Sequence, residues 1–296
     1  MNDSCIKDFI QYLRFEKRVS HHTLIAYEQD LIQFSGYLAT EFDSIDLPAV
    51  TRFHIRSFLA KLKGDAVKET TLNRKMASLS SFFRFLLKQQ IMSVNPVKQL
   101  HGLRKEERLP QYLKEKEAEI LLEEMTFGEG FKGFTDRLIC ELLYQTGMRR
   151  NELAQLKETD IEWSLKQIRV LGKGNKERLI PIGILTLKQI EEYIAEKKKM
   201  GLRTVPQLLV LENGKPLYSN YIYRVVKNHL KEVTTLKKKS PHILRHSFAT
   251  HLLNNGANIQ AIKDLLGHSS LAATQIYTHN NIEKLKEIHK LNHPRS

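Results

Sequence analysis

The stretch QIRVLGKGNKERLIPIG, residues 167–183, decides the fold class, because it is the clearest strand signal in a chain of helical patterns. Ile168 and Val170 lie on one side of the turn, and Leu179, Ile180 and Ile182 lie on the other. The intervening GKGN supplies the glycine and asparagine that a tight connection between antiparallel strands requires. The stretch therefore predicts a small antiparallel sheet of two or three strands.

The sheet is expected inside a mostly helical domain that spans residues 114–296. LLVLENGKPLY, residues 208–218, predicts one more short strand and a turn. Other periodic stretches of this part have apolar residues at helical spacing. The expected fold class of the C-terminal domain is therefore mixed α+β, in a chain that is mainly α.

Residues 1–94 carry four helical patterns joined by short connections, which predicts a four-helix bundle. Ser20 precedes the second pattern and is a predicted N-cap. NPVKQLHGLRKEERLPQYL, residues 95–113, then interrupts every periodicity with two prolines, a glycine and a run of charge. We interpret it as a linker, so two domains are expected, at 1–94 and 114–296.

The charge of the chain favours a polyanionic partner, either nucleic acid or an acidic membrane surface. The net charge of the 296 residues is +14 and the pI is about 9.6. Residues 1–100 hold 14 Lys and Arg against 10 Asp and Glu, so the basic excess is shared by both parts of the chain. A well-solvated surface is the alternative explanation of this charge.

The sequence lacks the features of secreted and membrane proteins. MNDSCIKDFI, residues 1–10, has no basic region followed by an apolar one, so no secretory signal is predicted. No apolar stretch approaches the length of a membrane span. Cys5 and Cys140 make neither a disulfide framework nor a zinc pattern, and Cys140 lies in the apolar run LICELLY, which predicts a core position. A cytoplasmic location is expected.

Two arginines lie at a break between predicted helices in LLYQTGMRRNELAQL, residues 142–156. One helix is expected to end at Gly147 and the next to begin with NELAQL, with Arg149 and Arg150 at the junction. A guanidinium held near Glu152 would form a rigid fork that fits a phosphate. A solvated arginine is the alternative for either residue.

A lysine lies at the tip of the predicted hairpin. Lys173 is flanked by glycines, and its ammonium is charged at neutral pH because the ordinary pKa of lysine is about 10.4. Such a tip can lie in a DNA groove and carry a proton to an oxygen there. Lys176 and Arg178 are candidates for contacts with the DNA backbone. A merely soluble turn is the alternative.

Cationic groups are crowded into HILRHSFATH, residues 242–251. Ser240 is a predicted N-cap and Pro241 a predicted first helical residue. His242 and Arg245 are three residues apart, so they share a face near the N-terminus of this helix. A guanidinium at this place would attract a phosphate.

The same helix has part of a metal-binding pattern. His242 and His246 are spaced as in the zinc helix His-Glu-x-x-His, but Ile243 occupies the position of the glutamate. No cysteine lies close in sequence to complete a ligand set, and Arg245 would repel a dication. No metal is therefore predicted, and His246 and His251 are expected to be structural.

The stretch NIQAIKDLLGHSSLAATQIYTH, residues 258–279, combines an apolar helical stripe with two polar groups beyond it. The stripe stops at Gly267, and His268 follows directly, where an imidazolium would suit the carbonyl end of a helix. Tyr277 lies on a further predicted helix. Taken alone, His268 is interpreted as a helix C-cap and Tyr277 as a surface or half-buried aromatic residue. The helix–turn–helix pattern of 244–266 also permits a plain DNA-binding unit.

Taken in order, TGMRRNEL, GKGNKER, HILRHSFATHLLNNG and LLGHSSLAATQIYTH resemble the motifs of the catalytic domain of the tyrosine recombinases, the phage-integrase family. The N-terminal four-helix unit resembles the core-binding, SAM-like domain of that family, so the resemblance covers essentially the whole chain. Its length points to the Xer branch, which resolves chromosome dimers in bacteria. Arg150 and Asn151 depart from the commoner pattern of a hydrophobic residue and a serine.

The resemblance implies a DNA-cutting and rejoining enzyme that uses neither metal nor ATP. Tyr277 would attack a DNA phosphodiester and form a 3′-phosphotyrosyl intermediate on the way to a Holliday junction. Glu152 would support the first arginine. The implied catalytic residues are Arg149, Lys173, His242, Arg245, His268 and Tyr277, with Arg150, Lys176 and Arg178 as DNA contacts.

The partners implied are double-stranded DNA with a specific recombination site and further subunits. Four copies, or two copies each of this chain and a related recombinase, would act on two sites. The C-terminal tail, residues 282–296, would dock into a neighbouring subunit. On the active-site helix, His242 and Arg245 are expected to be exposed toward a phosphate, with Leu244 and Phe248 facing the core.

Other functions stay open at this point. An integrase or resolvase of a mobile element fits the same motifs, and so does a type IB topoisomerase-like enzyme that relaxes supercoils with the same tyrosine chemistry. A regulator that binds DNA without cutting it would keep the basic charge and need no Tyr277. A metalloenzyme is a further alternative.

Overall fold

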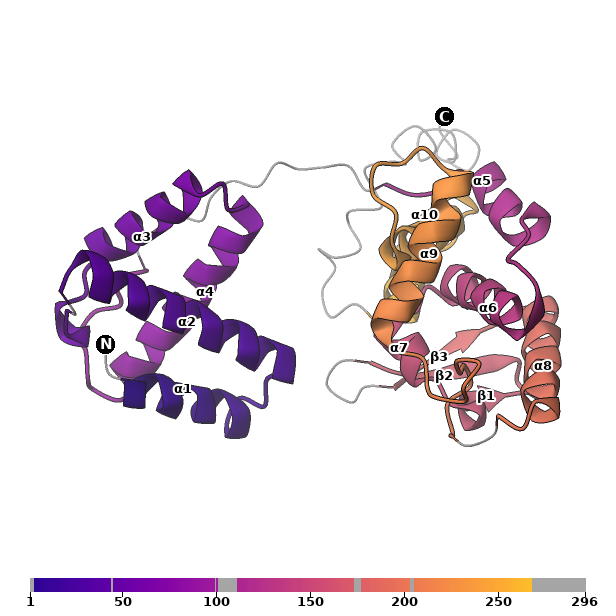
Figure 1. The fold of residues 1–296 in the computed structure, drawn as a ribbon, viewed down its shortest axis with the longest axis horizontal. Helices are drawn as coiled ribbons and strands as arrows, with labels where there is room; N and C mark the ends of the chain where they lie inside the picture. The colour runs from indigo at the N-terminus through magenta and orange to yellow at the C-terminus, as the bar shows by residue number, and fades with distance from the viewer. Residues whose placement is uncertain are drawn as a thin grey trace, which may run out of the picture. The chain divides into compact units, whose positions relative to one another are not determined.

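The computed structural model describes residues 3–43, 45–98, 100, 111–172, 177–202 and 205–267. The chain divides into two compact units, Met1–Glu107 and Arg108–Ser296, each with its own hydrophobic core (Figure 1). The domain and linker boundaries expected from the sequence stay predictions. Among the described residues, no helix combines the length and the hydrophobicity needed to cross a membrane.

The N-terminal unit contains the four predicted helices: α1 (Asp3–Phe15), α2 (His21–Glu41), α3 (Arg52–Gly64) and α4 (Glu69–Lys88). A short 3₁₀ helix, η1 (Leu47–Ala49), lies between the second and third. Ser20 is the N-cap of α2, and its hydroxyl accepts the backbone N–H of Thr23 at 3.3 Å, as predicted. The interior contains aromatic rings in edge-on contact, such as Phe9 with Phe82 and Phe34 with Phe58.

One buried carboxylate joins two helices of this unit. Asp30 of α2 is 1% exposed, and it accepts bonds from Arg74, from Lys75 Nζ at 2.8 Å and from Ser78 Oγ at 2.7 Å, all on α4. A buried carboxylate is tolerated only when it is paired in this way. The network therefore fixes how α2 lies against α4.

The C-terminal unit is a helical domain with one small sheet. Its helices pack around α6 (Gly130–Thr146), which lies against α7 (Arg150–Gln155), α8 (Ile184–Lys199), α9 (Ser219–Val233) and α10 (Pro241–Asn254) and is buried on most of its surface. Cys140 on α6 is fully buried, which confirms the predicted core position and raises the pKa of its thiol. The other elements are α5 (Glu115–Glu119), the π-helical turn η2 (Ile120–Glu124), η3 (Glu158–Asp160), β1 (Ile161–Glu162), β2 (Gln167–Leu171), β3 (Glu177–Pro181) and α11 (Ile259–Leu266).

The sheet is antiparallel, with the order β1-β2-β3, as the hairpin motif predicted. Ile168 pairs with Ile180, and Val170 pairs with Arg178. Because paired residues of antiparallel strands project to the same face, Arg178 shares the buried face of Ile168, Val170 and Ile180.

The further strand predicted at 208–218 is wrong. This stretch forms a turn with one isolated bridge, between Val210 and Pro216. The bonds from Leu211 N–H to Lys215 O and from Leu217 N–H to Leu209 O close the turn, and the pairing ends there because Leu208 N–H donates to Leu156 O at 2.8 Å instead. Leu208, Leu209 and Val210 are all buried, without the alternation of a half-buried strand.

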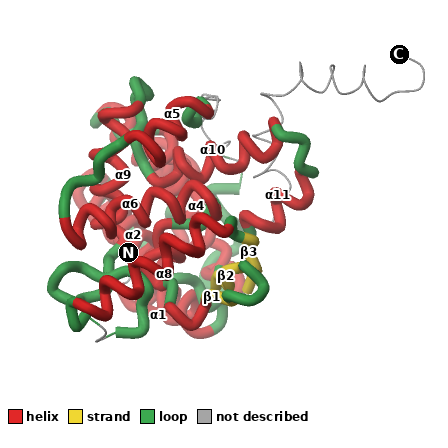
Figure 2. Tube along the Cα trace, turned by 90° about the vertical axis from the view of Figure 1, so that its right-hand side faces the viewer, coloured by secondary structure: helices red, strands yellow, loops and turns green. Residues whose placement is uncertain are grey.

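The helices α10 and α11 lie near the end of the described chain, and α10 carries the predicted site residues His242 and Arg245. Figure 2 shows α11 beside β3, and α11 also packs on α10. Its attachment is a small apolar cluster, separate from the main core, with Ala249, Ile262 and Leu266 fully buried and Phe248 at its edge.

Candidate active site

The turn between α6 and α7 places the first predicted arginine. Gly147 ends α6 in the left-handed conformation, with φ 59°, and its N–H donates to Leu143 O at 3.1 Å. Arg149 then serves as the N-cap of α7. Its backbone N–H donates to Glu152 Oε2 at 2.7 Å and its guanidinium to Glu152 Oε1 at 2.8 Å. The predicted pairing of this arginine with Glu152 is confirmed.

Gly147 could not carry a side chain in this structure. A Cβ at this position would lie 2.4 Å from Phe248 Cδ1 and 2.9 Å from Leu266 Cδ2. We expect Gly147→Ala to destabilise the C-terminal unit by about 2–5 kcal/mol, from left-handed strain and overpacking together. Denaturant unfolding measures this free energy of unfolding.

A matched control for this variant is Gly36→Ala in α2. A Cβ at Gly36 meets nothing within 4 Å, and the residue lies inside a helix. Alanine there should be neutral or stabilising by about 0.5–1 kcal/mol. Equal stability of the two variants would contradict the close packing of Gly147 against Phe248.

Arg178 is the first correction to the sequence analysis. A contact with the DNA backbone was expected, but its side chain is only 9% exposed. Its Nη2 and Nη1 donate to the two oxygens of Glu152, at 2.6 and 3.1 Å, and its Nε donates to Leu265 O at 2.7 Å. The period of two along β3 was the missed signal, because Arg178 lies two residues before the buried Ile180.

Arg245 is the second correction. It was expected to be an exposed cation, but the residue is 5% exposed. Its Nη1 donates to Gly147 O at 2.6 Å and its Nη2 to Leu266 O at 2.7 Å. Both acceptors lie far from Arg245 in sequence, so no local pattern indicated its burial. Leu244 is fully buried, as expected, and Phe248 is half-buried.

Three successive carbonyls at the end of α11 accept bonds from three different arginines. Leu265 O accepts from Arg178 at 2.7 Å, Leu266 O from Arg245 at 2.7 Å, and Gly267 O from Arg149 at 3.3 Å. The C-terminus of a helix carries partial negative charge, which guanidinium groups stabilise. The structure thus brings Arg149, Glu152, Arg178 and Arg245 together at this helix end.

His242 joins the cluster from the first turn of α10. The residue is exposed, in agreement with the prediction. The pKa of its imidazole is nevertheless lowered, first by the protein atoms packed against part of the ring and then by the positive charges of Arg245, Arg150 and Arg149. Because these charges act on the same ring, the predicted cationic residues of two separate motifs do converge.

The other two histidines of α10 have different surroundings. The pKa of His246 is lowered to about 4 by burial and by His242 and Arg245, so its ring is neutral at pH 7. His251 is buried, with one ring nitrogen 2.8 Å from Tyr144 Oη and the other 2.8 Å from Leu113 O. Its predicted structural role is confirmed, since it ties residue 113 to α10.

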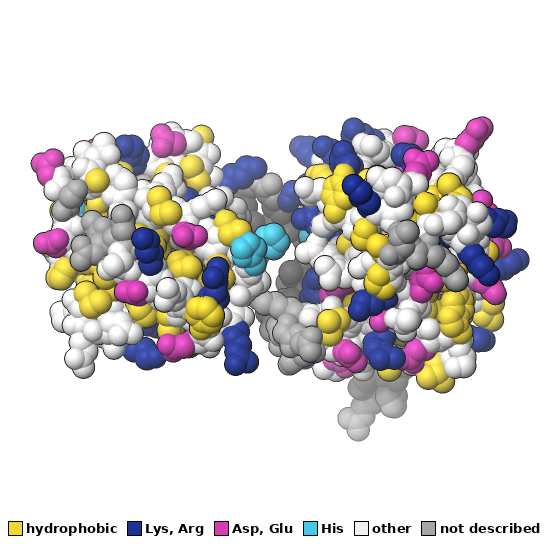
Figure 3. Space-filling view, turned by 60° about the horizontal axis from the view of Figure 1, so that its bottom comes forward, with side chains coloured by type: hydrophobic (Ala, Val, Ile, Leu, Met, Phe, Trp, Pro, Cys, Tyr) yellow, Lys and Arg dark blue, Asp and Glu magenta, His cyan; other side chains and the backbone are white. Residues whose placement is uncertain are grey.

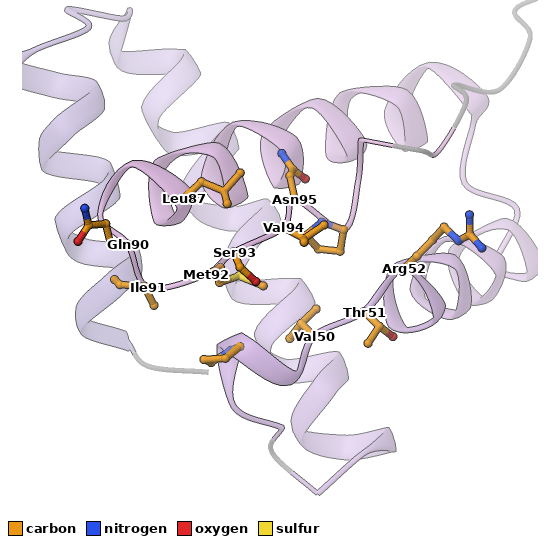
Figure 4. Close-up of a pocket in the computed structure, with 12 residues that line it drawn as sticks. Val50, Thr51, Arg52, Leu87, Gln90, Ile91, Met92, Ser93, Val94 and Asn95 are labelled. Atoms are coloured by element: carbon orange, nitrogen blue, oxygen red, sulfur yellow. The ribbon is translucent and has the colours of Figure 1, made fainter.

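A hollow of about 600 Å³ adjoins the cluster, with Arg149, Glu152, Lys157 and Gly172 among its lining residues. A second hollow, of about 830 Å³, lies in the N-terminal unit between the start of α3 and the segment after α4 (Figure 4). Arg52 is the one charged residue among those that line it. The N-terminal hollow therefore lacks the paired ionisable groups that acid–base chemistry uses.

The basic residues are distributed over both units. On the face shown in Figure 3, Lys and Arg side chains are spread over each unit, with Asp and Glu among them. Arg150 lies over the ring of Tyr223, with 5.9 Å between the guanidinium carbon and the ring centroid. In the part of the chain that the structure describes, no three His, Cys, Asp or Glu side chains are grouped as a metal site requires.

Several predicted site residues lie outside the described residues. They are Lys173 and Lys176 of the hairpin tip, His268, Tyr277 and the tail 282–296. Their predicted roles, and the DNA contact of Arg150, stay predictions.

Comparisons with known proteins agree with the arrangement of motifs. Residues 111–284 match the Phage integrase family, and residues 6–90 match the Phage integrase, N-terminal SAM-like domain. A protein of Pelobacter propionicus named tyrosine recombinase XerC is 38% identical over 292 residues, which cover 98% of this chain and 95% of the relative. A protein of the same name from Listeria innocua is 37% identical over 293 residues, covering 98% and 97%.

Two solved structures share the architecture. XerA recombinase is 27% identical, with a TM-score of 0.55, and covers 99% of this chain and 100% of that one. XerH site-specific recombinase, bound to a palindromic difH substrate in a post-cleavage complex, has a TM-score of 0.78 and 24% identity over 96% of this chain and 83% of that one. The second likeness shows the fold alone. The chain belongs to the phage integrase family and is a tyrosine recombinase, an enzyme that cuts and rejoins DNA strands.

Proposed function

We propose that this chain recombines DNA at one specific site, with Tyr277 as the nucleophile and Arg149, Arg245 and His242 around the attacked phosphate. The observation that carries the proposal is the convergence of the two arginines on the end of α11. The chain continues from this helix end toward Tyr277, ten residues after Gly267. The guanidinium groups of Arg149 and Arg245 thus lie where the segment that bears Tyr277 begins.

Each residue has a role that its chemistry suits. The phosphodiester gathers negative charge on its non-bridging oxygens as the phenol attacks, and the two guanidinium groups can bind those oxygens. His268 can donate a further hydrogen bond. Lys173 would protonate the 5′ oxygen that leaves, since its ammonium is charged at neutral pH. The bond energy is kept in the phosphotyrosine, so rejoining needs no ATP.

His242 is proposed as the group that takes the proton of Tyr277. The lowered pKa keeps its ring neutral at pH 7, so a ring nitrogen is free of its proton and can accept one. The free phenol has a pKa of about 10 and needs such help.

This role predicts how cleavage depends on pH. Protonation of His242 at low pH blocks proton acceptance, so the single-turnover cleavage rate should fall in acid. Because the pKa of His242 is lowered in the DNA-free protein, the midpoint of that fall should lie below the ordinary value of 6.5 when rates are measured at DNA concentrations well below saturation. Such rates from about pH 5 to pH 8 test this, and His242→Gln should lose the acid limb. A midpoint above 6.5 would contradict the assignment.

The biological role proposed is resolution of chromosome or plasmid dimers in the cytoplasm, where bacterial DNA lies. The XerC names of the relatives from Pelobacter propionicus and Listeria innocua support this choice over mobile-element integration. We further propose a tetramer on two DNA sites, with or without a second related recombinase, in which the tail 282–296 docks into the neighbouring subunit. Native gels of the protein on paired sites would report the number of subunits.

A nicked suicide substrate tests the proposal. The nick lets the cut strand end diffuse away, so the covalent intermediate accumulates and appears as a protein–DNA band on a denaturing gel. We expect a band with DNA that carries the chain's own recombination site and none with scrambled DNA. Adducts on every sequence, together with relaxation of plasmids that lack a site, would favour the topoisomerase-like alternative. Absence of any adduct would favour a binding protein.

A further inference from the structure

The guanidinium of Arg178 is bonded on every side to protein groups. Two of its nitrogens contact the two oxygens of Glu152, at 2.6 and 3.1 Å, and the third contacts Leu265 O at 2.7 Å. The stem of the side chain also lies against the helix end, since a Cβ on Gly267 would be 3.3 Å from Arg178 Cδ. The side chain of this β3 residue is 9% exposed and is packed against α7 and α11.

The carboxylate of Glu152 is shared between Arg178 and Arg149. It is 6% exposed and accepts the guanidinium and the backbone N–H of Arg149 in addition to the two bonds from Arg178. Burial favours a raised pKa, but the bonds from Arg178 and Arg149 outweigh it and hold the pKa of Glu152 below its usual value. The carboxylate is therefore charged. Because Arg178 fixes the position of this carboxylate, the carboxylate in turn orients the guanidinium of Arg149.

The helix end is the second group that Arg178 fixes. Its bond to Leu265 O stands next to the bonds of Arg245 to Leu266 O and of Arg149 to Gly267 O. Of the three contacts, the one with Arg149 is the longest, and the side chain of Arg149 is 37% exposed. Arg149 is thus open to an incoming phosphate, whereas each of the three guanidinium nitrogens of Arg178 already bonds to a protein group.

We infer that Arg178 is a positioning residue for strand cleavage, which orients Arg149 through Glu152 and holds the end of α11 through Leu265 O. The inference rests on the proposed function and adds to it a residue that touches no DNA. Lysine could not replace this arginine, because a single ammonium lacks the planar fork that spans a carboxylate and a carbonyl at once.

The test compares Arg178→Met and Arg178→Lys with Arg169→Met in the full chain. Arg169 lies on the neighbouring strand β2, is 45% exposed and pairs with Glu162, so its loss removes the same charge from the same sheet. The readouts are the single-turnover rate of adduct formation on a suicide substrate at saturating DNA, and the DNA affinity across a salt series.

Both Arg178 variants should cleave about 10- to 100-fold more slowly, as expected when a supporting group is lost. Their DNA affinity and its salt dependence should match those of Arg169→Met. A phosphate contact would give the opposite result: weaker binding, a log–log salt slope reduced by about 1, and recovery with lysine. That result, or wild-type cleavage rates in both variants, would overturn the inference.

A pH profile separates positioning from general damage to the fold. Without Arg178, Glu152 loses two hydrogen bonds that hold its pKa down, so its protonation should begin at higher pH. In a His242→Gln background, which removes the fall assigned to His242, the cleavage rate should therefore fall at higher pH with Arg178→Met than with Arg169→Met. The same low-pH profile in both variants would count against the shared carboxylate.

One readout does not depend on cleavage at all. Amide hydrogen exchange of α11 in the DNA-free protein should be faster in both Arg178 variants than in Arg169→Met, because a bond to its last turn is gone. If wild-type protein forms no adduct on any DNA, the proposed function fails while this comparison still decides the role of Arg178. Unchanged exchange in α11 would overturn the inference.

Discussion

Replacing Tyr277 with phenylalanine should abolish covalent attachment to DNA and leave DNA binding within about twofold of wild type. The substitution removes one hydroxyl and keeps the ring, so any packing of that ring is retained. A phenyl ring has no oxygen to attack phosphorus, and the arginines and His242 would then surround a phosphate without a nucleophile. Suicide-substrate gels measure the adduct, and gel shifts on intact sites measure binding.

The matched control is Tyr218→Phe. Tyr218 is 49% exposed before α9, and its hydroxyl accepts a bond from Arg224 at 2.6 Å. This variant should form adducts at the wild-type rate. An adduct formed by the Tyr277 variant would place the nucleophile on another residue and remove the basis of the proposed reaction.

Replacing Arg245 with lysine should slow cleavage by about 100- to 1,000-fold, equal to about 2.7–4 kcal/mol of transition-state stabilisation. The guanidinium is held by Gly147 O and Leu266 O at the same time, which fixes the direction of its remaining N–H groups. An ammonium keeps the charge but cannot bond to two carbonyls and a phosphate in that fixed geometry. The single-turnover rate at saturating DNA measures the effect.

Thermal unfolding and DNA affinity complete this experiment. Arg245 is buried, so the lysine variant is expected to be less stable, and rates are compared at a temperature where it is folded. A variant that binds DNA less tightly but cleaves at the wild-type rate once saturated would show that Arg245 contributes to binding alone.

The parts of the fold that local patterns determine were predictable from the sequence. Apolar spacing predicted the four N-terminal helices, and the apolar residues on both sides of GKGN predicted the hairpin of β2 and β3. The end of α6 at Gly147 was also expected, because a glycine followed by a new helical start is typical of a helix end. The strand expected near Val210 does not form, because Leu208 N–H donates to the distant Leu156 O instead of extending the pairing with the segment after the turn.

The site was only partly predictable, for a physical reason. Arg149 and Glu152 are three residues apart on one helix start, so their contact is local. The acceptors of Arg245 are 98 and 21 residues away, and the Glu152 that binds Arg178 is 26 residues away. Charge and spacing identified the arginines, but which of them would be enclosed depended on the tertiary position of α11.

The small apolar cluster that attaches α11 has a thermodynamic consequence. Eight residues are fastened through Ala249, Ile262 and Leu266, while the main core around α6 is built from other residues, with Leu265 only at its margin. Detaching this helix exposes little apolar surface, so its main cost is the loss of the bonds that Arg178, Arg245 and Arg149 donate to its last carbonyls, and this local cost is below that of unfolding the whole unit. The catalytic scaffold can thus stay folded while the peptide that precedes the phenol undocks and returns.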